Sequence, residues 1–340
     1  MRSKAWAALA VGGLLAGGAA AQQGQVNVIC SVQADWCNLI QTVYAKTTGV
    51  KVNMSLKGSG EALAQLIAER ANPKTDVWFG GTGDPHLQAA EQDLTLEYKS
   101  ASLPQLHEWA QQQAKQSGYK TVGIYSGPLG FGYNTELLAK KKIAAPACWK
   151  DLIKPELAGE VQMANPNASG TAYTAIATLV QVMGEEPAFD YMKKLNANVN
   201  QYARSGIGPM TAVTRGEVYV GSTVLHGVIN EIVRGFPVLP ILPCEGVGYE
   251  IGSTAVIKGT RNLDAARKFV DFALSPAGQQ IGLDVKEFAI PTNRSVALPP
   301  QVPKLTDIKV INYDFAKYGS SETRKRLLER WEKEIGQAPR

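Results

Sequence analysis

Short apolar runs alternate with amphipathic segments in the first part of the chain, and this alternation constrains the fold more than any other feature. The runs at 26–30, 51–56 and 76–79 have the length and composition of strands, whereas residues 34–46 and 61–70 carry helical spacing. Repeated strand–helix units predict an α/β fold, in which helices flank a mostly parallel sheet. The 340 residues are enough for two such domains.

Two glycine-punctuated apolar runs interrupt this alternation. The first is TVGIYSGPLGFGYN at 121–134, and the second is GVGYEIG at 246–252, whose third glycine comes one residue too late for a dinucleotide-binding fingerprint. A second strand–helix series lies between them. The two runs therefore predict two lobes joined by a strand hinge, with a cleft between the lobes. We assign residues 26–125 and 255–300 to lobe 1, 126–254 to lobe 2, and 301–340 to a C-terminal strap and helix.

The first 21 residues have the pattern of a signal peptide. Arg2 and Lys4 precede an uncharged, mostly apolar stretch that ends in three alanines before Gln22. The alternative is a membrane anchor, but this stretch is rich in glycine and, at roughly 17 residues, marginal for crossing a bilayer. We expect export and cleavage after Ala21.

Four cysteines, Cys30, Cys37, Cys148 and Cys244, would then meet an environment that permits disulfides. Three pairings are possible. Cys30 lies at the end of a predicted strand and Cys37 one turn into the next helix, so a bridge between them is geometrically easy and leaves Cys148 to pair with Cys244. A zinc site is the alternative, but it requires paired CxxC spacings or nearby histidines, which this sequence lacks.

The sequence lacks the signals of several other functional classes. It has no phosphate-binding P-loop, no HExxH and no GxSxG motif. Its net charge of +5 comes without a long basic block, so we expect no nucleic-acid partner. The three histidines are scattered: His107 is expected on a helix surface and His86 at a helix start. His226 begins a helix directly after a strand, where ligand contact and helix packing are both open.

The strongest local signal is NPNASGTAY at 165–173, where a strand ends and a long apolar helix begins. Ser169 is a suitable N-cap, and Ser169, Gly170 and Thr171 place hydroxyls and free N–H groups at the positive end of the helix dipole. Ser59 and Gly60 repeat this arrangement in lobe 1. A capped helix without a ligand is the plainer interpretation, but two such helix starts facing each other across a cleft would bind a small anion.

At these residues the sequence becomes similar to a known family. The motifs KGSGEALAQL, DVWFGGTGDPHLQAA, SGPLGFGYN, NPNASGTAY and CEGVGYEIG resemble those of periplasmic solute-binding proteins of ABC importers. The branch they resemble includes ferric-ion, phosphosugar and aminoethylphosphonate binders. The resemblance implies a monomeric two-lobed clamshell of type II that delivers its solute to a membrane permease and its ATPase. It implies neither catalysis nor a cofactor.

The solute is expected to be an organic anion. Ferric-ion binders of this branch carry adjacent tyrosines, whereas NQYARS at 200–205 has one tyrosine and an arginine, Arg204. Resemblance to the hexose-phosphate binders implies that Ser59, Ser169, Gly170 and Thr171 hold a phosphate. It also implies that His226 and Glu250 contact sugar hydroxyls, although Gly227 follows His226 where those proteins have an aspartate.

The remaining expected ligand contacts come from loops at strand ends, where α/β sheets bind ligands. They are Ser31, Thr82, Gly83, Asp84 and, just inside its helix, Tyr173. A sugar phosphate or another organophosphate is the predicted solute. Alternatives are a ferric ion, a secreted phosphate-ester hydrolase and a protein that presents the same ligand to a sensor.

Overall fold

The structure, a computed structural model, describes residues 24–304 and 308–338, so the predicted signal peptide lies outside the described residues. Ten strands are present in the described part of the chain: β1 (Gln25–Cys30), β2 (Lys51–Leu56), β3 (Val77–Thr82), β4 (Val122–Asn134), β5 (Val161–Ala164), β6 (Val199–Ala203), β7 (Val220–Val224), β8 (Val238–Ile241), β9 (Tyr249–Val256) and β10 (Ile290–Pro291). They pair in the order β2-β1-β3-β9-β4-β7-β5-β6, with β8 and β10 also on β4.

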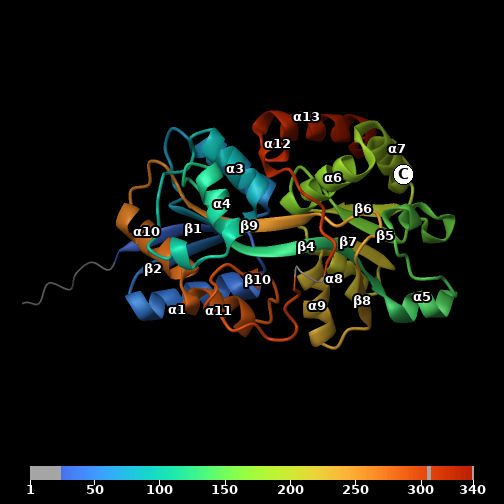
Figure 1. The fold of residues 1–340 in the computed structure, drawn as a ribbon, viewed down its shortest axis with the longest axis horizontal. Helices are drawn as coiled ribbons and strands as arrows, with labels where there is room; N and C mark the ends of the chain where they lie inside the picture. The colour runs from blue at the N-terminus through green and yellow to red at the C-terminus, as the bar shows by residue number, and fades with distance from the viewer. Residues whose placement is uncertain (1–23, 305–307, 339–340) are drawn as a thin grey trace, which may run out of the picture.

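Helices surround these strands on both sides (Figure 1). They are α1 (Ala34–Thr48), α2 (Ser59–Glu69), α3 (Gly83–Glu91), α4 (Glu108–Gln116), α5 (Thr135–Lys141), α6 (Gly170–Met183), α7 (Glu185–Asn196), α8 (Gly208–Thr214), α9 (Leu225–Val233), α10 (Leu263–Leu274), α11 (Pro276–Asp284), α12 (Phe315–Tyr318) and α13 (Ser321–Trp331). The helices and strands of the first third agree with the predicted strand–helix alternation.

Strand direction separates the lobes from the hinge. β1 pairs in parallel with β2 and β3, and β5 pairs in parallel with β6 and β7. β4 and β9 are antiparallel to each other and run through the middle of the molecule from one lobe to the other (Figure 1). The first glycine-punctuated run is therefore β4, the second leads into β9, and the predicted clamshell with a strand hinge is confirmed.

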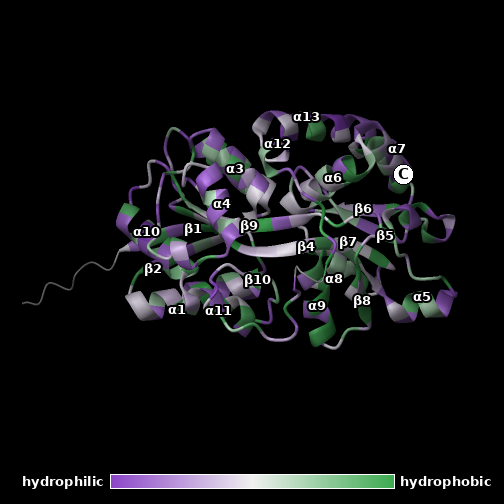
Figure 2. Ribbon diagram, in the orientation of Figure 1, coloured by the Kyte–Doolittle hydropathy of each residue, from purple (hydrophilic) through white to green (hydrophobic). Residues whose placement is uncertain are grey.

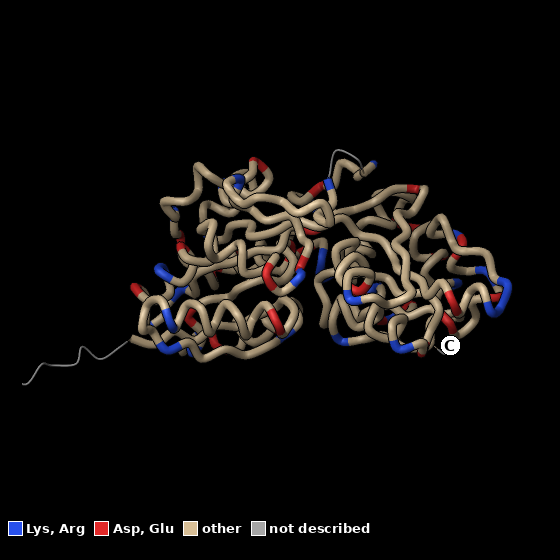
Figure 3. Tube along the Cα trace, turned by 90° about the horizontal axis from the view of Figure 1, so that it is seen from below, with Lys and Arg blue, Asp and Glu red and all other residues tan. Residues whose placement is uncertain are grey.

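Each lobe has its own hydrophobic core. One cluster packs residues of β1, β3, α1, α4 and α10 around Phe79 and Phe269. The other packs α6, α7 and β5 around Trp149 and Phe189. Apolar residues lie mainly on the inward sides of the helices (Figure 2), and charges of both signs are scattered over the outside of both lobes (Figure 3).

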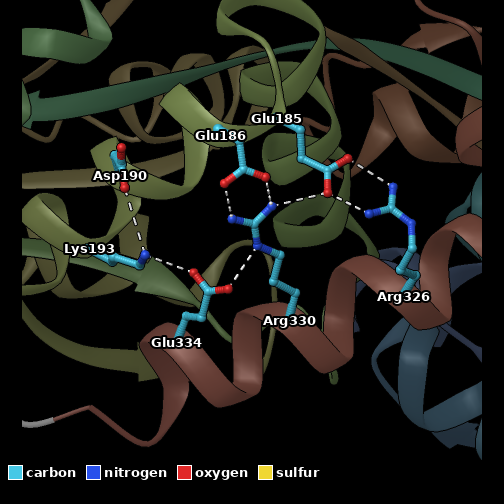
Figure 4. Close-up of polar contacts among 7 residues, drawn as sticks. All are labelled: Glu185, Glu186, Asp190, Lys193, Arg326, Arg330 and Glu334. Atoms are coloured by element: carbon cyan, nitrogen blue, oxygen red, sulfur yellow. Dashed lines mark hydrogen bonds and ion pairs between the residues drawn. The ribbon is translucent and has the colours of Figure 1, made fainter.

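The C-terminal helix packs on lobe 2. Leu327 and Trp331 of α13 belong to the core of that lobe. On the surface, Arg330 pairs with Glu185 and Glu186 of α7 and with Glu334, and Arg326 also pairs with Glu185 (Figure 4). This network fixes α13 against α7.

No helix in the described part of the chain is both long and apolar enough to cross a membrane. The two predicted disulfides, Cys30–Cys37 and Cys148–Cys244, are both present.

Candidate functional site

A cavity of about 350 Å³ lies between the two lobes. Lobe 1 contributes the loops that lead into α1, α2 and α3, and lobe 2 contributes the loops that lead into α6 and α8. The hinge strands close it from behind with Tyr125 of β4 and Glu250 of β9. Eight of the expected ligand-binding residues line this cavity: Ser31, Ser59, Thr82, Ser169, Gly170, Thr171, His226 and Glu250.

The first turns of α2 and α6 lie against each other at this cavity. The backbone N–H of Gly60 in α2 donates to the carbonyl of Ala168, which precedes α6, at 3.0 Å. A Cβ at Gly60 would overlap the carbonyl oxygen of Asn167, and a Cβ at Gly170 would overlap Thr82 Oγ1. Both glycines are therefore required for the lobes to approach this closely.

Serine side chains organise the two helix starts. Ser169 is the N-cap of α6, and its Oγ accepts a hydrogen bond from the Ala172 N–H at 3.3 Å. Ser59 Oγ accepts from the Thr82 N–H at 3.1 Å, which ties α2 to the loop after β3. Each hydroxyl still has its own proton to donate. The positive ends of two helix dipoles and these donors make this part of the cavity suitable for an anion.

The rest of the cavity wall presents buried polar side chains. Burial lowers the pKa of His226 to about 4, so the imidazole is neutral at pH 7, and its Nδ1 has no partner among the described residues. Burial raises the pKa of Glu250 to about 7, and Thr171 Oγ1 donates to Glu250 Oε2 at 2.8 Å. The buried Thr82 Oγ1 also has no partner within the described chain. Such groups suit hydrogen bonds to neutral hydroxyls.

Several lining residues were not predicted. Lys57 precedes α2, Arg204 follows β6, and Tyr125 lies in the first half of β4. Arg204 pairs across the cleft with Glu61, in the first turn of α2. The position of Lys57, directly before Gly58 and Ser59, was a signal for a basic residue beside an anion. No local pattern indicated that Tyr125 would reach the cavity, whereas Arg204 lies in the stretch that the resemblance aligns with the tyrosines of ferric-ion binders.

Four expected ligand contacts, Gly60, Gly83, Asp84 and Tyr173, do not line the cavity. Gly60 forms part of the lobe contact described above, and a Cβ at Gly83 would overlap Gln113 Nε2. Asp84 is buried, and its Oδ2 accepts from Tyr313 Oη at 3.0 Å and Thr174 Oγ1 at 3.4 Å. The hydroxyl of Tyr173 donates to the Tyr318 carbonyl at 2.6 Å. The contacts of Asp84 and Tyr173 depend on the C-terminal strap, whose path the sequence did not indicate.

The single tyrosine of residues 200–205, Tyr202, does not line the cavity. Tyr202 Oη donates to Asn196 Oδ1 at 2.9 Å, and its ring packs edge-on against Trp331. Cys148, Cys244 and Glu245 are the one group of potential metal ligands that lie together in the described chain. Both of these cysteines are in a disulfide, so neither offers a thiolate to a metal.

Comparison with known proteins agrees with this architecture. Residues 72–318 match the family model described as "Bacterial extracellular solute-binding protein". The solved structure of the periplasmic binding protein AfuA from Actinobacillus pleuropneumoniae, described with exogenous fructose-6-phosphate bound, is 44% identical. It has a TM-score of 0.90, and the match covers 93% of this chain and 99% of AfuA. The structure of the periplasmic binding protein P5PA is 37% identical, with a TM-score of 0.89 over 92% of this chain and all of P5PA.

A more distant relative is the Fe(3+)-binding periplasmic protein of Serratia marcescens, which is 25% identical over 93% of this chain and 94% of its own length. The family match spans well over half of the chain, and the similarity to AfuA extends over nearly all of it. The protein therefore belongs to the bacterial extracellular solute-binding protein family.

Proposed function

We propose that this protein captures a small anionic organic solute, a sugar phosphate or another organophosphate, in the cleft between its lobes. In this proposal it is the periplasmic substrate-binding component of an ABC importer, and it hands the solute unchanged to a permease and its ATPase. The observation that carries the proposal is the pair of helix starts, α2 from lobe 1 and α6 from lobe 2, that meet at one cavity. An anion bound there contacts both lobes and so favours the closed state.

The lining of the cavity offers partners for both parts of a sugar phosphate. Phosphate oxygens would accept hydrogen bonds from the N–H groups of the two helix starts, from the hydroxyls of Ser59 and Ser169 and from Lys57. The neutral imidazole of His226 and the carboxyl group of Glu250 would exchange hydrogen bonds with the hydroxyls of a polyol. The volume of about 350 Å³ is at the small end of ligand pockets. The sugar phosphate described in AfuA supports this choice of ligand.

A ferric ion is the second candidate, supported by the iron-binding relative from Serratia marcescens. Fe(III) is a hard cation that prefers anionic oxygen ligands. The cavity wall offers Tyr125 and Glu250, but Tyr202 contacts Asn196 and Trp331. Because two helix N-termini meet at the cavity, its backbone dipoles favour an anion over a cation.

Calorimetric titration of a double variant tests the anion site. We expect Ser169→Ala with Thr171→Ala to weaken binding of fructose 6-phosphate by at least about tenfold, because Ser169→Ala removes a hydroxyl donor from a charged ligand and Thr171→Ala removes the hydrogen bond that positions Glu250 in the cavity wall. Ser169→Ala also removes an N-cap, so Ser320→Ala, which removes the N-cap of α13 far from the cavity, is the matched control and should leave affinity unchanged.

Ligand selectivity provides a second test. Fructose 6-phosphate at 100 times its Kd should add about 2.7 kcal/mol of apparent stability in a thermal-shift assay, whereas fructose at the same concentration should add almost none. Equal stabilisation by fructose would contradict a phosphate-dependent site. A coloured complex with Fe(III), in protein that ignores organophosphates, would establish the iron alternative instead.

A further inference from the structure

A second cavity, of about 570 Å³, lies outside the ligand cleft, between lobe 1 and the C-terminal helix. Its walls come from α2 and α3 of lobe 1, from Asn167 of lobe 2 and from α13. α3 and the start of α13 are adjacent, since the Ser321 N–H donates to Glu91 Oε2 at 2.8 Å. Figure 1 shows α13 along the upper edge of the molecule, with its start toward α3. A ligand in this cavity would contact both lobes.

One wall carries an arginine with unusual surroundings. Arg324 of α13 is only 9% exposed, and its Nε and Nη2 have no hydrogen-bond partner among the described residues. Its guanidinium lies over the Tyr173 ring, 5.3 Å from the centroid. The carboxylate of Asp84 attracts it, but the Oδ2 atom of Asp84 accepts from Tyr313 and Thr174, and its Oδ1 atom has no partner within the described chain either. No ion pair or hydrogen bond from the described residues therefore satisfies the Nε and Nη2 donors of Arg324.

The opposite wall offers a second donor. Gln88 of α3 is 2% exposed, and its Nε2 also has no partner within the described chain. Gln88 and Arg324 line the same cavity from different lobes. Unpaired buried donors are costly, and an acceptor that reached either of them would relieve part of that cost.

The rest of the cavity combines an apolar wall with charges of both signs. Leu63 and Ile67 of α2 and Leu328 of α13 form the apolar wall, and Ile67 is 43% exposed. The charged lining residues besides Arg324 are Lys325, Lys333, Glu329 and Glu332. Glu332 accepts a hydrogen bond from Asn167 Nδ2 at 2.9 Å. Donors from Arg324 and Gln88, together with an apolar wall, suit a ligand that carries a carboxylate and an apolar chain.

We propose that this cavity is a second binding site, for a small organic carboxylate with a short apolar chain. The carboxylate pairs with Arg324, whose planar guanidinium matches two oxygens, and the chain packs on Leu63, Ile67 and Leu328. A ligand that bridges α3 and α13 stabilises one arrangement of the lobes over others. Occupancy of this site therefore changes affinity in the cleft, and the cleft ligand changes affinity here by the same factor.

Two matched probes separate charge from apolar contact. We would titrate hexanoate and 1-hexanol, which share the same chain, into the mature protein and follow its amide NMR signals. Hexanoate should bind saturably and shift signals of α3 and α13, and 1-hexanol should bind at least about fivefold more weakly, because it lacks the charge that pairs with Arg324. No saturation by hexanoate up to about 20 mM, or equal binding of both probes, would overturn the proposal.

Variants then locate the site. Arg324→Gln should weaken hexanoate binding by at least about tenfold, whereas Arg326→Gln, on the same helix but paired with Glu185, should not. Because Arg324 is buried, Ile67→Glu provides a second variant at a half-exposed wall position, and repulsion should weaken binding by about fivefold or more. Unchanged binding in both Arg324→Gln and Ile67→Glu would refute the assignment.

The cleft variant distinguishes this site from the proposed organophosphate site. Ser169→Ala with Thr171→Ala should bind hexanoate like the unmodified protein. Loss of hexanoate binding in that variant would place hexanoate in the cleft and overturn a second site. Failure of fructose 6-phosphate to bind would refute the proposed function but leave the hexanoate results intact.

Discussion

Gly60→Ala is the substitution that most selectively tests lobe closure. Gly60 lies in the first turn of α2, where alanine is a better helix former than glycine, so lobe 1 on its own tolerates the change. In the closed arrangement a Cβ at this position overlaps the carbonyl oxygen of Asn167, on the other lobe, and also comes within 3.1 Å of the Ala168 carbonyl oxygen. The added methyl group therefore penalises the closed state and not the open one.

The size of the effect follows from the atoms that must move. Both obstacles are backbone atoms, so relief requires the lobes to shift apart and weakens the hydrogen bond from the Gly60 N–H to Ala168. Overpacking of this kind costs about 1–3 kcal/mol. We expect affinity for fructose 6-phosphate to fall by about 5- to 150-fold.

Calorimetric titration measures the affinity, and small-angle scattering in the presence of ligand reports whether the lobes close. Gly24→Ala is the matched control, since a Cβ at Gly24 meets no atom within 4 Å. The ligand-free Gly60→Ala protein should unfold at the same temperature as the unmodified protein or slightly above it. Affinity unchanged by Gly60→Ala would refute the idea that the solute is held between touching helix starts.

Three further predictions concern stability. Burial raises the pKa of Glu250 from 4.5 to about 7, so this group stabilises the folded state fully below pH 4.5 and progressively less as the pH rises to 7. In urea titrations, the free energy of unfolding of the unmodified protein should therefore include a decrease on the order of 3 kcal/mol between pH 4.5 and 7.5 that Glu250→Gln removes. Equal pH profiles of the two proteins would contradict this. Arg330→Gln should lower the free energy of unfolding by about 1 kcal/mol, less at high salt, because the side chain is only 19% exposed, whereas Lys325→Gln, at 77% exposure, should change it little. Replacing Cys148 and Cys244 by alanine, which opens a loop with a sequence separation of 96, should cost up to about 4.7 kcal/mol in guanidinium titrations, and no loss would refute a stabilising role for the bridge.

Local patterns were sufficient to predict much of this fold. The helix expected at 34–46 is observed as Ala34–Thr48, and the strand expected at 51–56 is observed as Lys51–Leu56. The spacing of apolar residues and the residues that end each element lie close together in the sequence, so local patterns predict these elements. The Cys30–Cys37 bridge was predictable for the same reason, because its two cysteines are close in the sequence. The start of α6 was recognisable because Ser169 is its N-cap, as expected. The second helix was expected at 61–70 but begins at Ser59, with Gly58 and not Ser59 as its N-cap.

Features that depend on contacts between distant segments were harder to predict from the sequence. Asp84 was expected to reach the ligand because it follows a strand end, but Tyr313, from the strap, accounts for one of its hydrogen bonds. Arg204 reaches the cavity because the lobes bring it beside Glu61, which is 143 residues away. The boundaries assigned to the lobes stay a prediction, since the two hinge strands belong to both.

A crystal structure with fructose 6-phosphate tests the central claim most directly. We predict that the phosphate lies between the first turns of α2 and α6 and accepts hydrogen bonds from backbone N–H groups or hydroxyls of both, with the sugar toward His226 and Glu250. A phosphate bound to one lobe alone, or held at the outer rim by Lys57 and Arg204 without either helix start, would contradict it.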